Sequence, residues 1–184
     1  INYLNEINDV FNKYSEIDFI GGKILPLWSS DKPDWIKGSL LGALAMLDYG
    51  DQPFIINSNA SKSELRNKIF FGANFAFRKE MFIKYGGFDV KKVVAEDTEM
   101  CLRLYAKGIK GLYAPNVVVH HKVPVTRTTP QYFYQWYYTQ GTYQDFLEIS
   151  KPKFFQPFGI PLWFFMQTIK FFFISVFNTN PHKR

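Results

Sequence analysis

The chain has 184 residues, 47% of them hydrophobic and 21% charged, which is the size and composition of a globular protein with a buried core. Its single cysteine, Cys101, excludes an internal disulfide framework, so nothing in the sequence requires an oxidising compartment. The net charge of +6 and the aromatic content of 19% make an anionic membrane surface or nucleic acid the partners to consider. The chain starts at Ile1 without an initiator methionine or a basic leader, and we interpret this start as the inside of a longer protein.

The first expected elements are a helix and a buried strand. Apolar residues spaced by three and four predict an amphipathic helix over residues 1–14. The apolar run 17–28 predicts a buried strand, which we expect to break at Gly21 and Gly22 and to stop at Pro26.

The middle of the chain has shorter and weaker patterns. Polar turns or loops are expected at 29–37 and 48–53, and an exposed polar segment is expected at 57–68. The apolar run 40–47 is too short for its periodicity to separate a helix from a strand. Residues 69–77 predict a second strand.

The remaining elements alternate until about residue 121 and are mainly helical after it. This alternation predicts the α/β class. The expected segments are a helix at 78–85 ended by Gly86-Gly87, a helix at 97–107 ended by Gly108, extended pieces at 112–115 and 117–120, and aromatic-rich helices at 131–146 and 161–178.

Glu96 and Asp97 form an acidic pair at the start of the helix expected at 97–107. In one interpretation Asp97 caps this helix, because aspartate is a preferred N-cap and negative charge suits a helix N-terminus. The same account pairs Glu99 with Arg103 one helical turn later, but it does not require Glu96. In the other interpretation the pair is catalytic, and one carboxylate is a general base. The pair by itself leaves both interpretations open.

Five short segments contain or surround the pair. In chain order they are Gly72-Ala-Asn-Phe-Ala-Phe-Arg, Gly86-Gly-Phe-Asp, Ala95-Glu-Asp-Thr-Glu, Tyr113-Ala-Pro and Val119-His-His-Lys-Val-Pro. With these segments, residues 15–146 resemble the C-terminal half of the catalytic domain of family 2 glycosyltransferases. The resemblance implies an α/β fold with a partial GT-A-type mixed sheet flanked by helices, followed by aromatic-rich C-terminal helices.

The resemblance also implies a reaction, the inverting transfer of a sugar from a nucleotide-diphosphate sugar to a glycan or lipid-linked acceptor. Asp97 would take the proton from the acceptor hydroxyl, and Glu96 would hold the acceptor or tune its neighbour. Inversion suits a carboxylate, because it needs a base on the acceptor side and no enzyme nucleophile. Capping and catalysis are compatible, because an N-cap aspartate would leave one carboxylate oxygen free.

Further site residues follow from the resemblance. Gly72, Ala73 and Asn74 would lie under the donor sugar, where small side chains allow close approach and the Asn74 amide would meet a sugar hydroxyl. The alternative is that they are plain turn or strand residues. His121, with His120 as the second choice, would help to bind the divalent metal or the diphosphate, and the alternative is a surface histidine at a strand end.

Arg127 lies on a polar loop, where it would reach the leaving diphosphate in a bidentate fork or remain a solvated arginine. The Asp-x-Asp motif with which the resembling family holds its metal is missing, and Asp48-Tyr-Gly-Asp has the wrong place and spacing. We therefore expect the chain to be a fragment that is inactive alone. Its divalent metal, Mg²⁺ or Mn²⁺, would be held mostly by the missing N-terminal part.

The segment 151–184 is basic and aromatic and contains no acidic residue. Its run 161–178 is apolar with polar residues on one side, which favours an amphipathic helix lying on a membrane over a single span. We expect residues 1–150 to be the acceptor-side part of a catalytic domain and 151–184 to be a membrane-associated tail. The predicted location is the cytoplasmic face of the cell membrane, peripheral or single-span, with a membrane surface and no nucleic acid as partner. The rival hypothesis is a non-catalytic, membrane-associated binding module.

Overall fold

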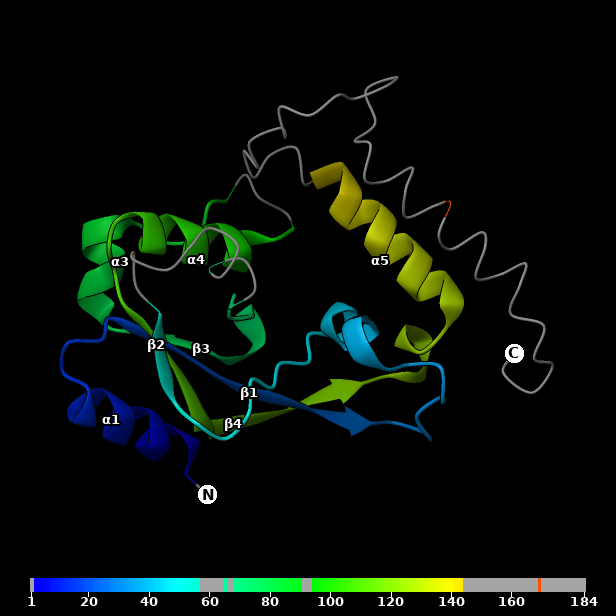
Figure 1. Cartoon of the computed structure of the whole chain (residues 1–184), viewed down its shortest axis with the longest axis horizontal. Helices are drawn as coiled ribbons and strands as arrows, with labels where there is room; N and C mark the ends of the chain where they lie inside the picture. The colour runs from blue at the N-terminus through cyan, green and yellow to red at the C-terminus, as the bar shows by residue number, and fades with distance from the viewer. Residues whose placement is uncertain (1, 57–64, 66–67, 91–93, 144–168, 170–184) are drawn as a thin grey trace. The chain divides into compact units, whose positions relative to one another are not determined.

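The computed structural model describes residues 2–56, 65, 68–90, 94–143 and 169 (Figure 1). The chain divides into two compact units, Ile1–Leu147 and Glu148–Arg184. Of the second unit only Ile169 is described, as a helical residue, so the predicted helix 161–178 and the predicted tail 151–184 otherwise lie outside the described residues. Within the described part of the chain, none of the helices is long and apolar enough to cross a bilayer.

In the described part of the first unit, four strands form a mixed sheet (Figure 1). They stand in the order β2-β4-β1-β3. The two long strands, β1 and β4, run parallel, whereas β3 is antiparallel to β1 and β2 is antiparallel to β4. This sheet confirms the expected α/β class. The strands are β1 Phe19–Trp28, β2 Phe54–Ile56, β3 Phe75–Phe77 and β4 Gly111–Val123.

Helices cover both faces of the sheet, because neighbouring side chains of the central strands point to opposite faces. On one face α1 packs Val10 against Ile20 and Leu112. On the other face α3 and α4 cover the cluster around Phe19 and Tyr113, and α4 contributes Met100, Cys101, Leu104 and Tyr105 to that cluster. The helices are α1 Tyr3–Lys13, α3 Lys79–Tyr85 and α4 Glu96–Ala106.

A third cluster lies at the far end of the long strands, around Val123 and Phe133. It joins α5 (Pro130–Tyr143) to a 3-10 helix, η1 (Gly38–Leu44), which is the form taken by most of the apolar run 40–47. The Tyr132 hydroxyl ties the two elements by donating to the carbonyl of Ala43 at 3.0 Å. The helix predicted at 131–146 is thus present as α5 within the described residues.

The strand β1 continues through its proline, so the expected stop at Pro26 is wrong. Pro26 stands in register with His121 of the parallel strand β4. Ile24 exchanges backbone hydrogen bonds with Leu47 at the edge of β1 that faces away from β4. Because strand residues alternate, Pro26 turns its nitrogen to that same edge, and its missing N–H costs the ladder with β4 nothing.

The expected break at Gly21 and Gly22 is also wrong. The strand continues with a shift in its register to β4 between Gly22 and Lys23. A Cβ on Gly21 would overlap the ring of Phe70, and a Cβ on Gly22 would overlap the carbonyl oxygen of Val117. The two glycines are therefore needed for close packing over the strand.

Residues 69–77 are mostly not a strand, contrary to expectation. Only Phe75–Phe77 joins the sheet, and Gly72–Asn74 form a 3-10 turn, η2. The reason is that Phe70 packs over Gly21, so the chain crosses β1 before it pairs with it. Two further differences are that the extended pieces at 112–115 and 117–120 belong to one strand, and that β2 was not predicted.

Candidate active site

Asp97 lies in the first turn of α4, and a backbone N–H binds each of its carboxylate oxygens. Oδ1 accepts from the N–H of Thr98 at 2.6 Å, and Oδ2 accepts from the N–H of Gly72 at 2.9 Å. The second contact joins residues that are 25 positions apart in the sequence. Oδ1 also accepts from the Thr98 hydroxyl at 3.3 Å, whereas Oδ2 accepts from Gly72 alone and keeps a lone pair that can take a proton from a substrate.

Asp97 is not the N-cap of α4, which corrects the capping interpretation. The N-cap is Ala95, whose left-handed backbone (φ 61°, ψ 28°) leads the chain into the helix. Glu96 and Asp97 therefore both stand in the first turn, where their charge still suits the helix dipole. The expectation of a free carboxylate oxygen is also wrong, because Gly72 binds the second one.

Gly72 and Ala73 are exposed beside Asp97, on the turn η2. A Cβ on Gly72 would lie 3.7 Å from Oδ2 of Asp97, which is an ordinary van der Waals distance. The fold therefore has room for a side chain at this position, and that side chain would stand next to the carboxylate. The structure brings these two predicted residues to the acidic pair.

Asn74 is buried, at 2% exposure, and its side chain is used inside the fold. Its amide nitrogen donates to the carbonyl of Lys23 at 2.8 Å and to that of Val117 at 2.9 Å. Its amide oxygen accepts from the hydroxyl of Tyr3 at 2.8 Å. These bonds occupy both amide hydrogens, so the expectation that the amide would meet a sugar hydroxyl is contradicted by the structure.

His120 and His121 point to opposite faces of the sheet, as alternation predicts, and the first is exposed whereas the second is half-buried. His121 pairs with Pro26, two residues beyond Ile24, so it lies on the face that carries α4. Its Nε2 atom is buried and has no hydrogen-bond partner. No contact in the described residues joins it to Asp97.

Arg127 ends a short 3-10 helix, η3 (Val125–Arg127), that precedes α5. It is half-buried, and its guanidinium carbon lies 5.8 Å from the ring centroid of Tyr132. It is therefore held against an aromatic ring rather than fully solvated, at a position that no described contact links to Asp97.

The described residues do not assemble a metal centre of their own. They contain no group of three or more histidine, cysteine, aspartate or glutamate side chains placed to hold an ion. The unpartnered Nε2 of His121 fits one ligand at most. The donor set therefore does not by itself fit the metal that the resemblance implies.

Two arginines, Arg103 of α4 and Arg78 at the end of β3, hold the fold around the candidate site. Arg103 pairs with Glu99 at 2.8 Å, as predicted, and it also donates to the carbonyls of Tyr85 and Gly87, both at 2.7 Å. It thereby fixes the glycine turn after α3. Arg78 donates to the carbonyl of Ile17 at 2.8 Å and so ties the end of β3 to the start of β1. This role of Arg78 was not predicted.

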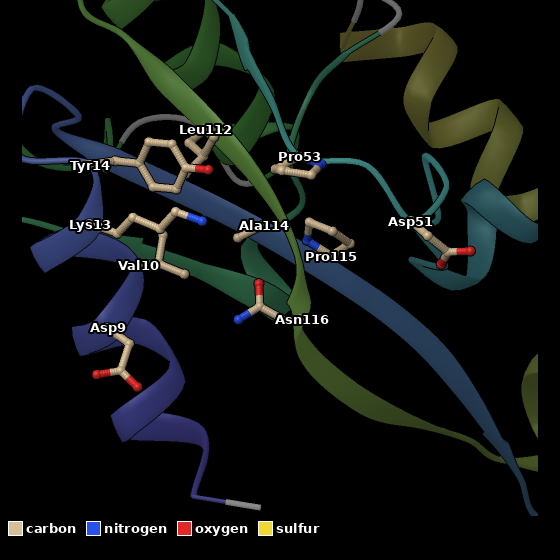
Figure 2. A pocket seen from close by; sticks show the side chains of 10 residues that line it. All are labelled: Asp9, Val10, Lys13, Tyr14, Asp51, Pro53, Leu112, Ala114, Pro115 and Asn116. Atoms are coloured by element: carbon tan, nitrogen blue, oxygen red, sulfur yellow. The ribbon is translucent and has the colours of Figure 1, made fainter.

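The described residues also line two cavities. One, of about 330 Å³, lies on the α1 face of the sheet, opposite to α4, and Figure 2 shows its lining side chains from α1, β4 and the loop before β2. The other, of about 280 Å³, lies beside the segment that leads into α4. Its lining residues are Val94, Tyr132, Gln135, Trp136, Thr139 and Gln140.

Comparisons with known proteins agree with the recognised segments. The sequence model of a family described as "Glycosyl transferase family group 2" matches residues 2–179. A curated relative, the glucosyl-dolichyl phosphate glucuronosyltransferase of Haloferax volcanii, is 21% identical over 159 residues, which are 82% of this chain and 48% of the relative. The chain thus spans about half the length of that relative. No solved structure matches.

Proposed function

The chain belongs to glycosyl transferase family group 2, and on that premise we propose that it forms the acceptor side of an enzyme that transfers a sugar from a nucleotide-diphosphate sugar to a glycan or lipid-linked acceptor. The observation that carries the proposal is the carboxylate of Asp97. It stands at a helix N-terminus beside the exposed Gly72 and Ala73, and two backbone donors orient it.

Asp97 is the general base of the proposed reaction. The acceptor hydroxyl oxygen forms a bond to the anomeric carbon of the donor sugar, while the bond from that carbon to the diphosphate oxygen breaks. The acceptor proton passes to a remaining lone pair of the Asp97 carboxylate, and the configuration at the anomeric carbon inverts. Glu96, in the same helical turn, holds the acceptor hydroxyls or tunes its neighbour. The backbone donors orient the base without blocking it, because Oδ2 accepts only the bond from Gly72 and keeps a lone pair for the proton.

Other residues of the chain serve the donor in this proposal. Gly72 and Ala73 form a floor that a sugar ring can approach closely, because both are small and exposed. Arg127 supplies a guanidinium fork for the leaving diphosphate. A divalent metal, Mg²⁺ or Mn²⁺, would neutralise the charge of the diphosphate and is held mainly by residues outside this chain, with His121 as the residue of this chain that could add a ligand.

The acceptor is proposed to be linked to a lipid. The name of the Haloferax volcanii relative denotes a sugar on dolichyl phosphate as its acceptor. The basic, aromatic segment 151–184 has the composition of a segment that lies on an anionic membrane surface. We accordingly place the enzyme at the cytoplasmic face of the cell membrane.

The substitution Asp97→Asn tests this proposal in the longest natural polypeptide that contains the chain. Transfer to the acceptor should fall by about 10²- to 10⁴-fold, because the amide cannot take the proton. Folding should persist, since the Asn side-chain oxygen still accepts one of the two backbone bonds. The measurement is the rate of sugar transfer from a labelled nucleotide-sugar to lipid-linked acceptors.

The matched control is Asp9→Asn, which removes an exposed carboxylate from α1 and should leave transfer unchanged. Unchanged activity of Asp97→Asn would contradict the catalytic role. It would leave the chain as a membrane-associated binding module.

A further inference from the structure

The register between the parallel strands β1 and β4 shifts at one point. Between Gly22 and Lys23 of β1, the paired residue on β4 advances from Ala114 to Val118. Residues 115–117 therefore have no partner on β1. At such a shift the backbone carbonyls on either side cannot all find a donor within the ladder, and a buried carbonyl without a donor is costly.

The side chain of Asn74 fills this irregularity. Its two amide hydrogens go to the carbonyls of Lys23 and Val117, which stand on the two strands at the shift. The absence of a side chain at Gly22 makes room for it, because a Cβ there would lie 2.5 Å from the Asn74 amide nitrogen. One buried amide therefore anchors the turn η2 to both long strands.

The anchored turn is the same one that holds the base. The N–H of Asn74 donates to the carbonyl of Phe71 at 3.0 Å and closes the turn around Gly72 and Ala73. The N–H of Gly72 then donates to Asp97 at 2.9 Å. With its far end fixed in the sheet and its loop closed, the turn has little freedom to move the donor that orients the carboxylate.

A second element fixes the amide itself. The hydroxyl of Tyr3, on α1, donates to the amide oxygen of Asn74 across 71 positions of sequence. The two carbonyls determine which way the amide faces, because they can only accept, and the amide oxygen is left to accept from Tyr3. The Tyr3 hydroxyl is protonated at neutral pH, and burial raises its pKa further.

We propose that Asn74 and Tyr3 are positioning residues for the base Asp97, acting through the turn η2 and the N–H of Gly72. This inference rests on the proposed function of Asp97. It assigns Asn74 a role in placing the base instead of a contact with the sugar, and it gives Tyr3 of α1, on the opposite face of the sheet, a part in that placement.

The experiment compares two variants that each remove one hydrogen bond between α1 and the sheet region. Tyr3→Phe removes the bond to Asn74. Asn116→Ala removes the exposed bond of 2.6 Å from Asn116 to Glu6, in which Asn74 takes no part. Both should lower the thermal midpoint to a similar, small extent. Only Tyr3→Phe should lower kcat, on the order of tenfold, because small displacements of a base slow the chemical step. KM for the nucleotide-sugar should stay the same in both.

A double-mutant cycle shows whether Tyr3 acts through the base. In the Asp97→Asn background, Tyr3→Phe should cause no further fall in the residual rate, because the group that it positions is gone. Asn74→Ala should lower kcat more than Tyr3→Phe does. If Asn74→Ala does not fold, the Tyr3→Phe cycle decides.

Three results would overturn the inference. They are an unchanged kcat in Tyr3→Phe, an equal fall in kcat in Asn116→Ala, or a fall in Tyr3→Phe that adds in full to that of Asp97→Asn. Each leaves the proposed function intact, provided that Asp97→Asn alone is inactive. Full activity of Asp97→Asn would instead remove the proposed function and this inference together.

Discussion

At the scale of single residues, the conformation of Ala95 decides where Glu96 and Asp97 stand in α4. Ala95 takes a left-handed conformation, which an L-residue adopts at a cost of about 1 kcal/mol. That conformation puts Glu96 and Asp97 into the first turn of α4 instead of before it. Asp97 can then accept from Gly72 and Thr98 at once. The backbone strain at Ala95 thus accompanies the placement of the proposed base.

Replacing the strained residue, Ala95→Gly, should stabilise the protein. Glycine adopts the left-handed conformation freely, so the free energy of unfolding should rise by up to about 1 kcal/mol, less what glycine costs in unfolded-state entropy. Urea unfolding measures the change. Ala45→Gly is the matched control, because Ala45 has the same φ of 61° at the end of η1, far along the chain from the acidic pair. A fall in stability for Ala95→Gly, with a rise for Ala45→Gly, would contradict strain at the helix start.

A substitution at Gly72 should affect sugar transfer without affecting stability. Gly72→Ala should leave the free energy of unfolding within about 0.5 kcal/mol of the parent, because its Cβ would make only an ordinary contact 3.7 Å from Asp97. Sugar transfer should nevertheless fall on the order of tenfold or more, because the methyl group stands where the reacting groups must approach. Gly42→Ala in η1 is the control, since a Cβ there meets nothing within 4 Å. Full activity of Gly72→Ala would show that this space is not used.

At the scale of elements, the register shift between β1 and β4 links the sheet to the turn η2. The shift leaves carbonyls that Asn74 binds, and Asn74 in turn anchors the turn that holds Asp97. An irregularity in a parallel ladder thereby becomes the attachment point of the turn beside the proposed base. This arrangement has no room for a residue larger than glycine at position 22 of β1.

The substitution Gly22→Ala should damage this junction. Its methyl group would overlap the carbonyl oxygen of Val117 and press on the Asn74 amide, so the free energy of unfolding should fall by at least about 2 kcal/mol. Chemical denaturation is the measurement. Gly141→Ala in α5 is the control, and it should stabilise slightly, because a Cβ there meets nothing within 4 Å and alanine favours a helix. Equal stability of Gly22→Ala and the parent would contradict the tight packing.

At the scale of the whole molecule, the described residues place the Asp97 carboxylate, the proposed base, beside the exposed Gly72. His121, whose Nε2 atom has no hydrogen-bond partner, lies on β4, and no described contact joins it to Asp97. The described residues do not contain a cluster of ligands for an ion. The chain covers 48% of the length of the curated relative that it matches. We therefore propose that most ligands of the metal lie outside the described residues.

We therefore expect the isolated 184-residue chain not to transfer sugar. Departure of a diphosphate without a metal or a dense cationic clamp is slow, and the described residues offer neither in full. The measurement is transfer from labelled nucleotide-sugars by the purified chain with Mg²⁺ or Mn²⁺ added. Transfer by the chain alone that disappears in Asp97→Asn would contradict this expectation.

By itself, the sequence determined the α/β class, the family and the end of α3 at Gly86, whose φ is 80°. These features rest on short-range patterns, namely apolar spacing, glycine positions and the order of short motifs. They can be recognised without knowing which distant residues meet.

Only the tertiary structure decided what Pro26, Asn74 and the two oxygens of Asp97 do. Pro26 is tolerated because its nitrogen faces the edge of β1 away from β4. Asn74 acts through partners 43, 51 and 71 positions away, and Asp97 through one that is 25 positions away. Such roles depend on where a residue's hydrogen bonds can be satisfied after folding, and local sequence patterns carry no information about partners that far along the chain.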